Sequence, residues 1–256
     1  MLKRLAVSAL TAASLFVSLA DQPAEAAKAV PVPNYDFSFE GVFGSFDQMA
    51  KQRGFQVYRE VCSACHGLRH VAFRNLTALG YSEDQIKALA AEYMVEDGPD
   101  ENGDMFMRPA IPADRIPSPY RNENEARLLN NGAYPPDLSL MAKKRKGGAD
   151  YIKALMVGYT DPPADVELMP GMYWNDYFPG HQIAMPQILY ANSVTFADGT
   201  EATLEQQSLD LATFLMWTAE PMMDTRKQTG LSVMLFLLVF TGLMYAVKRK
   251  VWSKLH

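Results

Sequence analysis

Both cysteines of this 256-residue chain lie in one short segment, Val61-Cys62-Ser63-Ala64-Cys65-His66, in which a histidine directly follows the second cysteine. Two thiols separated by two residues can each add to one vinyl group of a single haem, and the adjacent histidine can then ligate the iron. With no third cysteine, the chain lacks the ligands of a zinc ribbon or an iron–sulfur cluster. The motif therefore predicts a fold built around one covalently attached haem c.

Two other interpretations of the cysteine pair stay open. A redox-active pair of the thioredoxin type would normally sit at the end of a strand in a βαβ unit, whereas the pattern before Cys62 is helical. Alternatively, Cys62 and Cys65 are two buried free thiols beside a solvent-facing histidine. The motif and its helical context favour haem attachment over both.

The N-terminal residues have the layout of a secretory signal peptide. Lys3 and Arg4 precede an apolar run, and small residues end at Ala27, so residues 1–27 are predicted to be removed just before Lys28. A short membrane anchor is the alternative, but the run holds three serines and a threonine and no stop-transfer pattern follows it. Export agrees with covalent haem attachment, which is an extracytoplasmic process in bacteria.

A second apolar run lies near the C-terminus, where the seventeen residues 231–247 carry no charge. At about 1.5 Å per residue this run spans about 25 Å, close to the ~30 Å hydrocarbon core of a bilayer. Four basic residues follow it and two precede it, which predicts a cytoplasmic C-terminus. A buried core helix is the alternative. We thus expect a periplasmic haem domain over residues 28–225, and a single transmembrane anchor with a short cytoplasmic tail over residues 226–256.

The predicted periplasmic domain is acidic. Residues 28–225 contain 16 Lys and Arg against 27 Asp and Glu, a net charge of −11. Such a domain would attract a basic soluble partner, although plain solubility explains the composition equally well. Six acids between Glu92 and Asp104, with no Lys or Arg among them, are the most pointed candidate for a docking segment. The basic run from Lys143 to Lys146 is more typical of a solvated helix end.

Helical patterns dominate between the two termini and predict an all-α fold. Capping residues and apolar periodicity predict five helices: one opening at Ser45 and running into the cysteine motif, one opening at Ser82, one from Asn122 to about Asn130, one from about Asp150 to Val157, and one opening at Thr203. Gly54 is a candidate for a close crossing of the first and last of these helices. Only Ser193 to Phe196 suggests a strand.

An electron carrier needs a second axial ligand that closes the iron, whereas a peroxidase or gas sensor needs an open side. Apart from His66, the histidine that could supply this ligand is His181. Two methionines, Met169 and Met185, precede proline in non-helical stretches, where the backbone is biased to an extended conformation. Spacing alone leaves these three candidates open, with Met185 as the leading methionine.

Several segments, in order along nearly the whole mature chain, resemble the cytochrome c1 family, the haem subunit of the ubiquinol–cytochrome c reductase (cytochrome bc1) complex. They are Gly54–Tyr58, the cysteine motif, Met105–Pro109, Asn130–Ser139, Tyr177–Gly180, Ile183–Pro186 and Phe214–Pro221. The resemblance implies a cytochrome c-like haem domain with long loop insertions and one C-terminal transmembrane helix.

The resemblance also implies roles for individual residues. It makes Cys62 and Cys65 the thioether attachments, His66 the proximal iron ligand and Met185 the distal one. Arg127 matches an arginine beside a haem propionate, and Tyr134 and Pro119 match walls of the haem pocket. Some bacterial relatives carry an extra cysteine pair in the loop before the methionine. This chain does not, so packing alone would have to hold that loop.

The function implied by the resemblance is transfer of one electron from a Rieske iron–sulfur protein to a soluble basic cytochrome c, with cytochrome b as a further partner. The chain would be a subunit of the oxidoreductase without catalysis of its own, in the bacterial inner membrane and in contact with lipid; no nucleic acid partner is expected. Two alternatives stay open: a membrane-tethered c-type cytochrome that donates electrons to a terminal oxidase, and a haem enzyme or sensor.

Overall fold

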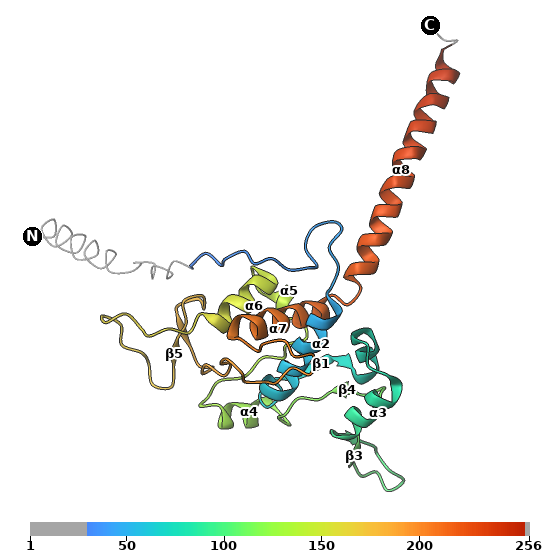
Figure 1. The fold of residues 1–256 in the computed structure, drawn as a ribbon. Coiled ribbons are helices and arrows are strands. Elements are labelled where there is room, and N and C mark those ends of the chain that lie inside the picture. Colours follow the sequence, from blue (N-terminus) through green and yellow to red (C-terminus); the bar gives the residue numbers. More distant parts are fainter. Residues whose placement is uncertain (1–29, 254–256) are drawn as a thin grey trace, which may run out of the picture.

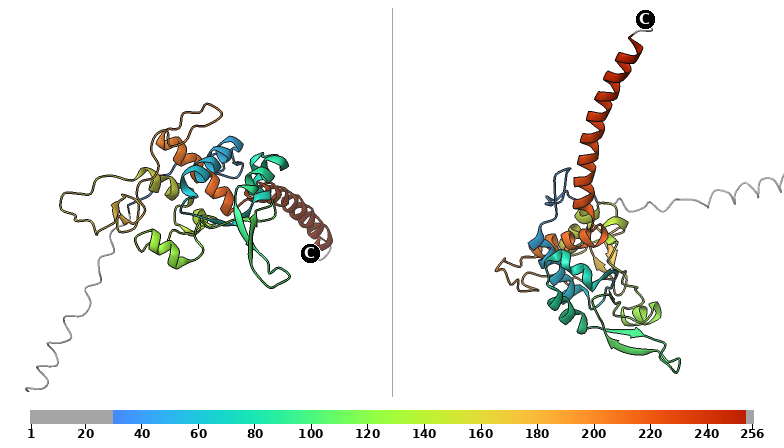
Figure 2. Two further views of the ribbon diagram at one scale, coloured as in Figure 1. Left: turned by 90° about the horizontal axis from the view of Figure 1, so that it is seen from below. Right: turned by 90° about the vertical axis from the view of Figure 1, so that its right-hand side faces the viewer.

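The computed structural model describes residues 30–253, and the predicted signal peptide over residues 1–27 lies outside this range. Figure 1 shows a domain of short helices and long loops from which one long C-terminal helix projects. Two further views show that this helix extends away from the domain on one side only (Figure 2). The described chain thus separates into a folded domain and a projecting helix.

The centre of the domain is the crossing of two helices, α2 (Gln48–Val57) and α7 (Leu204–Ala219). Gly54 lies at the contact, where a Cβ atom would come within 2.0 Å of the carbonyl oxygen of Asp210 and 2.7 Å of the Cβ of Phe214. The two helices approach so closely only because Gly54 has no side chain. The predicted close crossing at Gly54 is confirmed. It fixes α2 against α7 shortly before the cysteine motif.

We expect Gly54→Ala to destabilise the domain by about 1–3 kcal/mol or more, because overpacking at a tight contact forces backbone shifts. The measurement is the midpoint of urea unfolding of the detergent-solubilised chain, followed by circular dichroism. Gly230→Ala is the matched control: it also replaces a helical glycine, and no atom lies within 4 Å of its added Cβ. Equal midpoints for the two variants would contradict the close crossing.

The remaining helices follow the capping signals closely. Helix α3 (Glu83–Ala91) begins after Ser82, whose capping box is present, and α4 (Glu123–Leu129) begins after Asn122. Helix α6 (Gly148–Val157) ends at Gly158, and the cap of α7 is Thr203. The start of α2 differs from prediction, because its cap is Asp47 rather than Ser45. A short helix α5 (Met141–Lys144) and a 3₁₀ helix η3 (Phe73–Leu79) were not predicted.

The domain is helix-rich but not all-α, which corrects the predicted class. The described residues contain three two-stranded antiparallel sheets. They pair β1 (Leu68–Ala72) with β4 (Arg115–Ile116), β2 (Met94–Asp97) with β3 (Phe106–Pro109), and β5 (Tyr173–Trp174) with β6 (Gln182–Ile183). The strand expected at Ser193 to Phe196 is wrong: Ser193 closes a turn with Tyr190 through hydrogen bonds of 2.9 and 3.0 Å.

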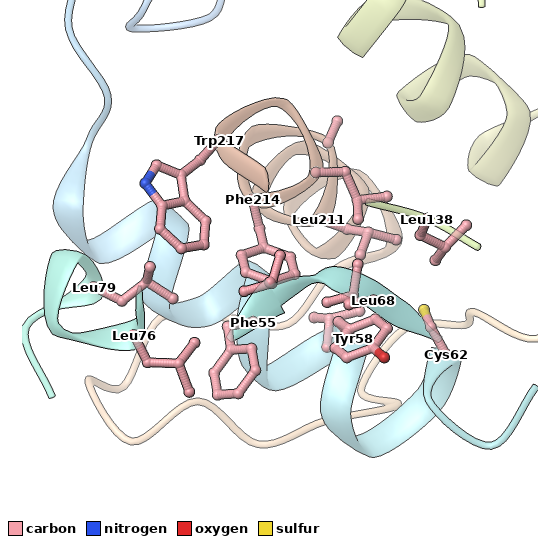
Figure 3. Packing of buried hydrophobic residues seen from close by; sticks show 14 of the residues in the cluster. Phe55, Tyr58, Cys62, Leu68, Leu76, Leu79, Leu138, Leu211, Phe214 and Trp217 are labelled. Atoms are coloured by element: carbon pink, nitrogen blue, oxygen red, sulfur yellow. The ribbon is translucent and has the colours of Figure 1, made fainter. Parts of the chain in front are cut away.

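Aromatic side chains from α2 and α7 fill the core between them (Figure 3). Phe55 and Phe214 pack with ring centroids 5.5 Å apart, and Phe214 stacks on Trp217 at 5.8 Å. Tyr58 continues the cluster, and Cys62 lies at its edge in Figure 3. The first cysteine of the motif is therefore part of the hydrophobic core rather than of a surface loop.

A buried ion pair joins the same two helices. The guanidinium of Arg53 contacts the carboxylate of Asp210 at 2.7 and 3.1 Å, and it reaches Asp198 at 2.8 Å. Asp210 is fully buried, and burial raises its pKa while Arg53 acts in the opposite direction. The contact with Asp210 in turn raises the pKa of Arg53. Since two N–H groups face the carboxylate at short range, we treat the pair as ionised.

Helix α8 (Met223–Trp252) is the projecting helix. Among the described residues it is the one helix long and apolar enough to cross a membrane, and the apolar window lies outside the packed domain. Its first turns are tied to the domain by Glu220, which pairs with Arg226 at 2.6 Å and with Lys143 at 3.0 Å. Only three residues separate α7 from α8, so the junction is short.

Candidate haem site

The cysteine motif follows a change in helix geometry. Helix α2 passes directly into a π-helix, η2 (Tyr58–Cys62), whose wider turn is closed by a hydrogen bond of 2.8 Å from the Ser63 N–H to the Tyr58 carbonyl. A tight turn then carries the motif, in which the amides of Cys65 and His66 both donate to the Cys62 carbonyl. Such π-helical turns are found frequently at functional sites.

The two cysteines have different surroundings. Cys62 is buried and Cys65 is exposed. Burial raises the pKa of the Cys62 thiol to about 12. A redox-active pair of the thioredoxin type instead needs a thiol with a lowered pKa. This difference, together with the helix that precedes the motif, argues against the redox-pair interpretation.

His66 is buried, with 8% of its surface exposed, so it does not face solvent. Its Nδ1 lies 2.7 Å from the carbonyl oxygen of Pro136, a contact in which Nδ1 carries the proton and donates. Burial lowers the pKa of the ring, so the neutral form is favoured. A neutral imidazole whose Nδ1–H is held by a carbonyl presents Nε2 as its free donor atom, the arrangement that metal-ligating histidines use.

The segment that supplies Pro136 is one of those on which the family resemblance rests. Besides the contact to His66, the amide of Leu138 donates to the Gly67 carbonyl at 3.0 Å, and Asp137 accepts from the amide of Arg69 at 2.8 Å. On the N-terminal side of the motif, the hydroxyl of Tyr58 in η2 donates to the His66 carbonyl at 2.9 Å. His66 is therefore fixed by both its ring and its backbone.

The predicted pocket residue Pro119 lies in the loop that passes the motif. Its neighbour Ser118 lies so close to Gly67 that a Cβ on this glycine would be 3.0 Å from the Ser118 Cα. The next residue, Tyr120, accepts a hydrogen bond of 2.9 Å from the Asn130 side chain. Burial raises the pKa of Tyr120, and the proximity of Cys65 raises it further. Tyr120 thus lies near the second cysteine, although sequence reasoning did not single it out.

Arg127 and Tyr134 lie together, as two residues of one pocket should. The Arg127 guanidinium is 5.8 Å from the centroid of the Tyr134 ring, and it also donates to the Gly132 carbonyl at 2.9 Å. Its present carboxylate partner is Glu123, at 2.6 Å on the exposed side of α4. Both side chains are more than one-third exposed, so the guanidinium remains accessible to a further anionic group.

Met185 is half-buried and packs against the core cluster that includes Cys62. Its carbonyl oxygen accepts a hydrogen bond of 3.0 Å from the hydroxyl of Tyr159, and burial raises the pKa of this tyrosine. The loop is therefore held by a hydrogen bond as well as by packing. This contact comes from 26 residues away and has no signal in the local sequence.

The two other candidate ligands have different surroundings. The His181 ring stacks on Trp174 with centroids 4.7 Å apart, and its Nδ1 lies 3.3 Å from the Asn175 carbonyl. Met169 is exposed. Of the two methionines, Met185 rather than Met169 packs against the core that contains Cys62.

These residues fit a haem. The buried neutral His66 has a free Nε2 and directly follows the second of two cysteines, and the half-buried thioether of Met185 packs on the core that contains Cys62. An imidazole and a thioether are ligands that haem iron takes, and the two thiols are placed to attach the haem. A helix-rich domain with such a site and one long apolar helix has the architecture of a membrane-associated c-type cytochrome.

Comparison with known proteins agrees with this class, and the chain belongs to the cytochrome c1 family. The model of the Cytochrome C1 family matches residues 37–255. Cytochrome c1 of Rhodospirillum rubrum is 47% identical over 95% of this chain and 96% of its own length. "Cytochrome b/c1" of Bradyrhizobium diazoefficiens is 46% identical over 98% of this chain and 40% of its own length. The "cytochrome b-c1 complex catalytic subunit, mitochondrial" of Candida albicans is 45% identical over 96% of this chain.

Proposed function

We propose that this chain is the electron-transfer subunit of a ubiquinol–cytochrome c reductase, which takes one electron from a Rieske iron–sulfur protein and delivers it to a soluble basic cytochrome c. The observation that carries the proposal is the buried His66, oriented by the Pro136 carbonyl next to two cysteines, in a chain of the cytochrome c1 family. We further propose cytochrome b as its membrane partner and the quinol chemistry as the work of other subunits.

Each site residue has a separate task in this proposal. Cys62 and Cys65 would attach the haem through two thioethers, and His66 and Met185 would supply the two protein ligands of its iron. Pro136 and Tyr58 hold His66 in one orientation, and Tyr159 holds the backbone of Met185. Arg127 is placed to pair with a propionate, with Tyr134 and Pro119 as pocket walls. A haem held by histidine and methionine supplies one-electron transfer at a raised potential.

We also propose that α8 spans the bacterial inner membrane, with the haem domain in the periplasm and the C-terminus in the cytoplasm. The length and apolar composition of α8 support the span, and the basic residues that follow it support the orientation. We propose boundaries near residues 28 and 226 for the signal peptide, the haem domain and the anchor; the start of α8 at Met223 supports the second of these.

The test is purification of the complex from native membranes in mild detergent, followed by identification of the co-purifying chains. Co-purification of a cytochrome b and a Rieske protein is expected. Co-purification with a terminal oxidase instead would favour the tethered electron donor, and binding of carbon monoxide to the untreated reduced protein would favour a haem enzyme or sensor.

The acidic segment from Glu92 to Asp104 supplies the first strand and the connecting loop of the hairpin β2–β3, which projects from the domain on the side away from α8 (Figures 1 and 2). It is less highly charged than the sequence suggests, because two arginines from outside the segment pair with it. Glu92 contacts Arg59 at 2.8 Å, and Asp97 contacts Arg108 across the hairpin. Asp100 accepts amides of its own turn, so the acids left for a partner are Glu96, Glu101 and Asp104.

We expect a variant with Glu96→Gln, Glu101→Gln and Asp104→Asn to reduce a basic cytochrome c several-fold more slowly at low ionic strength. Rim charges act mainly on the association rate and its salt dependence. The difference should shrink near 0.15 M salt, where the Debye length is about 8 Å. The measurement is the second-order rate constant for reduction of the cytochrome c, determined by stopped flow. Asp161→Asn with Asp165→Asn is the control of similar charge, and a larger effect there would move the docking surface to that loop.

A further inference from the structure

One exposed apolar feature of the domain is not used by the proposed electron-transfer site. Within the loop before α2, residues 40–43 form a turn, called the tip here. In this tip the side chain of Val42 is 66% exposed and that of Phe43 is 83% exposed. Figure 1 shows this loop rising beside the first turns of α8, and the right-hand view of Figure 2 shows the same neighbourhood from another side. The two exposed side chains therefore lie next to the foot of the apolar helix.

The tip has a defined conformation. Lys227 of α8 donates through Nζ to the carbonyl oxygens of Phe39 and Gly44, which are the two ends of the tip. Gly44 closes it, since a Cβ there would lie 1.8 Å from the Glu40 carbonyl oxygen, and Gly41 turns with φ +68°. Asp224 of α8 also accepts the Phe46 amide at 3.3 Å. The tip is thus attached to α8 itself.

This attachment determines the position of the tip along the axis of α8. Lys227 lies four residues before Leu231, the first residue of the uncharged run, which corresponds to about 6 Å along the helix axis. Residues 40–43 extend beyond the carbonyls that Lys227 binds, in the direction in which α8 leaves the domain. The tip of residues 40–43 therefore lies near the level where the uncharged run of α8 begins.

A basic turn accompanies the tip on the same side of the domain. Lys143 of α5 pairs with Glu220 at the foot of α8, and the next three residues, Lys144, Arg145 and Lys146, are exposed cations. Clustered cations next to a membrane attract anionic lipid headgroups. An apolar tip flanked by cations matches the boundary between headgroups and acyl chains.

We propose that residues 40–43 form an interfacial anchor, in which Val42 and Phe43 enter the headgroup–acyl boundary of an anionic bilayer beside α8, while the turn 144–146 faces the headgroups. The proposal rests on the proposed membrane span of α8. It gives the domain a second point of contact with the bilayer, so that the haem domain is held at two positions.

The test uses the full-length holoprotein, carrying Phe43→Cys and a nitroxide spin label, in nanodiscs of phosphatidylcholine and phosphatidylglycerol. Leu128→Cys on α4 is the matched aqueous control, since Leu128 is equally exposed, and Leu238→Cys within α8 is the control for lipid. Val42→Cys is the second tip variant, in case Phe43→Cys misfolds, and the unsubstituted protein gives the background of labelling. Collisions with oxygen report lipid exposure, and collisions with a nickel chelate report water exposure.

We expect the label at residue 43 to collide with oxygen at least several-fold more, relative to the nickel chelate, than the label at residue 128. Equal ratios at residues 43 and 128, with residue 238 in lipid, would overturn the interfacial anchor and leave the proposed function intact. An immobilised label at residue 43 that neither reagent reaches would show a protein occupant and also overturn it. Free access of the nickel chelate to residue 238 would overturn the membrane span itself.

Discussion

Replacing Met185 by leucine is expected to lower the reduction potential of the holoprotein by a substantial fraction of the roughly 0.8 V that axial ligation spans among haem proteins. A thioether binds ferrous iron better than ferric iron, so its loss removes the stabilisation of the reduced state. The vacated position should also admit carbon monoxide. Redox titration of the visible spectrum, followed by addition of carbon monoxide to the reduced protein, measures both effects.

Met169→Leu is the matched control for this substitution, because Met169 also precedes a proline but is exposed and lies outside the core cluster. It should keep the potential of the unsubstituted protein and continue to exclude carbon monoxide. If Met185→Leu behaves like this control, Met185 is not the ligand. If His181→Ala shows the large shift instead, the distal ligand is His181.

The second large effect is expected at the crossing of α2 and α7, where Asp210→Ala leaves Arg53 without its buried partner. Removing one member of a buried ion pair costs about 3–5 kcal/mol, and we expect the lower end here because Asp198 still contacts Arg53. Urea unfolding of the detergent-solubilised chain measures the loss.

Asp198→Ala is the corresponding control, since it removes the more exposed partner of the same arginine. Exposed ion pairs contribute little to the free energy of unfolding, so this variant should unfold close to the unsubstituted chain. An equal loss in the free energy of unfolding for Asp210→Ala and Asp198→Ala would show that burial does not make the Asp210 contact with Arg53 the stronger one.

The sequence predicts the helices well where their ends depend on local side chains. Ser82, Asn122 and Thr203 each cap a helix as expected, because a cap needs only an oxygen that can reach an amide two or three residues on. Gly54 is a similar case, since a glycine within an apolar helical stripe indicates a close contact. The cysteine motif and its histidine are equally local.

Errors appear where distant residues decide the structure. Helix α2 is capped by Asp47 rather than Ser45 because Asp224, from the far end of the chain, accepts from the Phe46 amide, and Ser38 accepts from the Asp47 amide. The hairpin β2–β3 escapes prediction because its first strand is Met-Val-Glu-Asp, an acidic sequence without a clear alternation. The contact between Asp97 and Arg108 ties its two strands together.

The same limit applies to the candidate site. The Pro136 carbonyl that orients His66 is a backbone group, so no residue type in the sequence identifies it. Tyr159 and Tyr120 contribute hydroxyls from separate loops, and nothing in their spacing connects them to Met185 or Cys65. Sequence reasoning therefore proposes the donor residues of the candidate site, whereas the groups that orient these residues become visible only in the fold.

The short junction between α7 and α8 has a consequence for how partners meet this domain. Three residues connect the helices, Glu220 bridges Arg226 and Lys143 across the junction, and Lys227 and Asp224 bind the loop before α2. The domain therefore cannot tumble on its tether, and its orientation is already set before an encounter. If α8 spans the membrane as proposed, the domain has less rotational freedom to lose than a freely tumbling protein when the proposed soluble partner docks, which lowers the entropic penalty of a brief and repeated association.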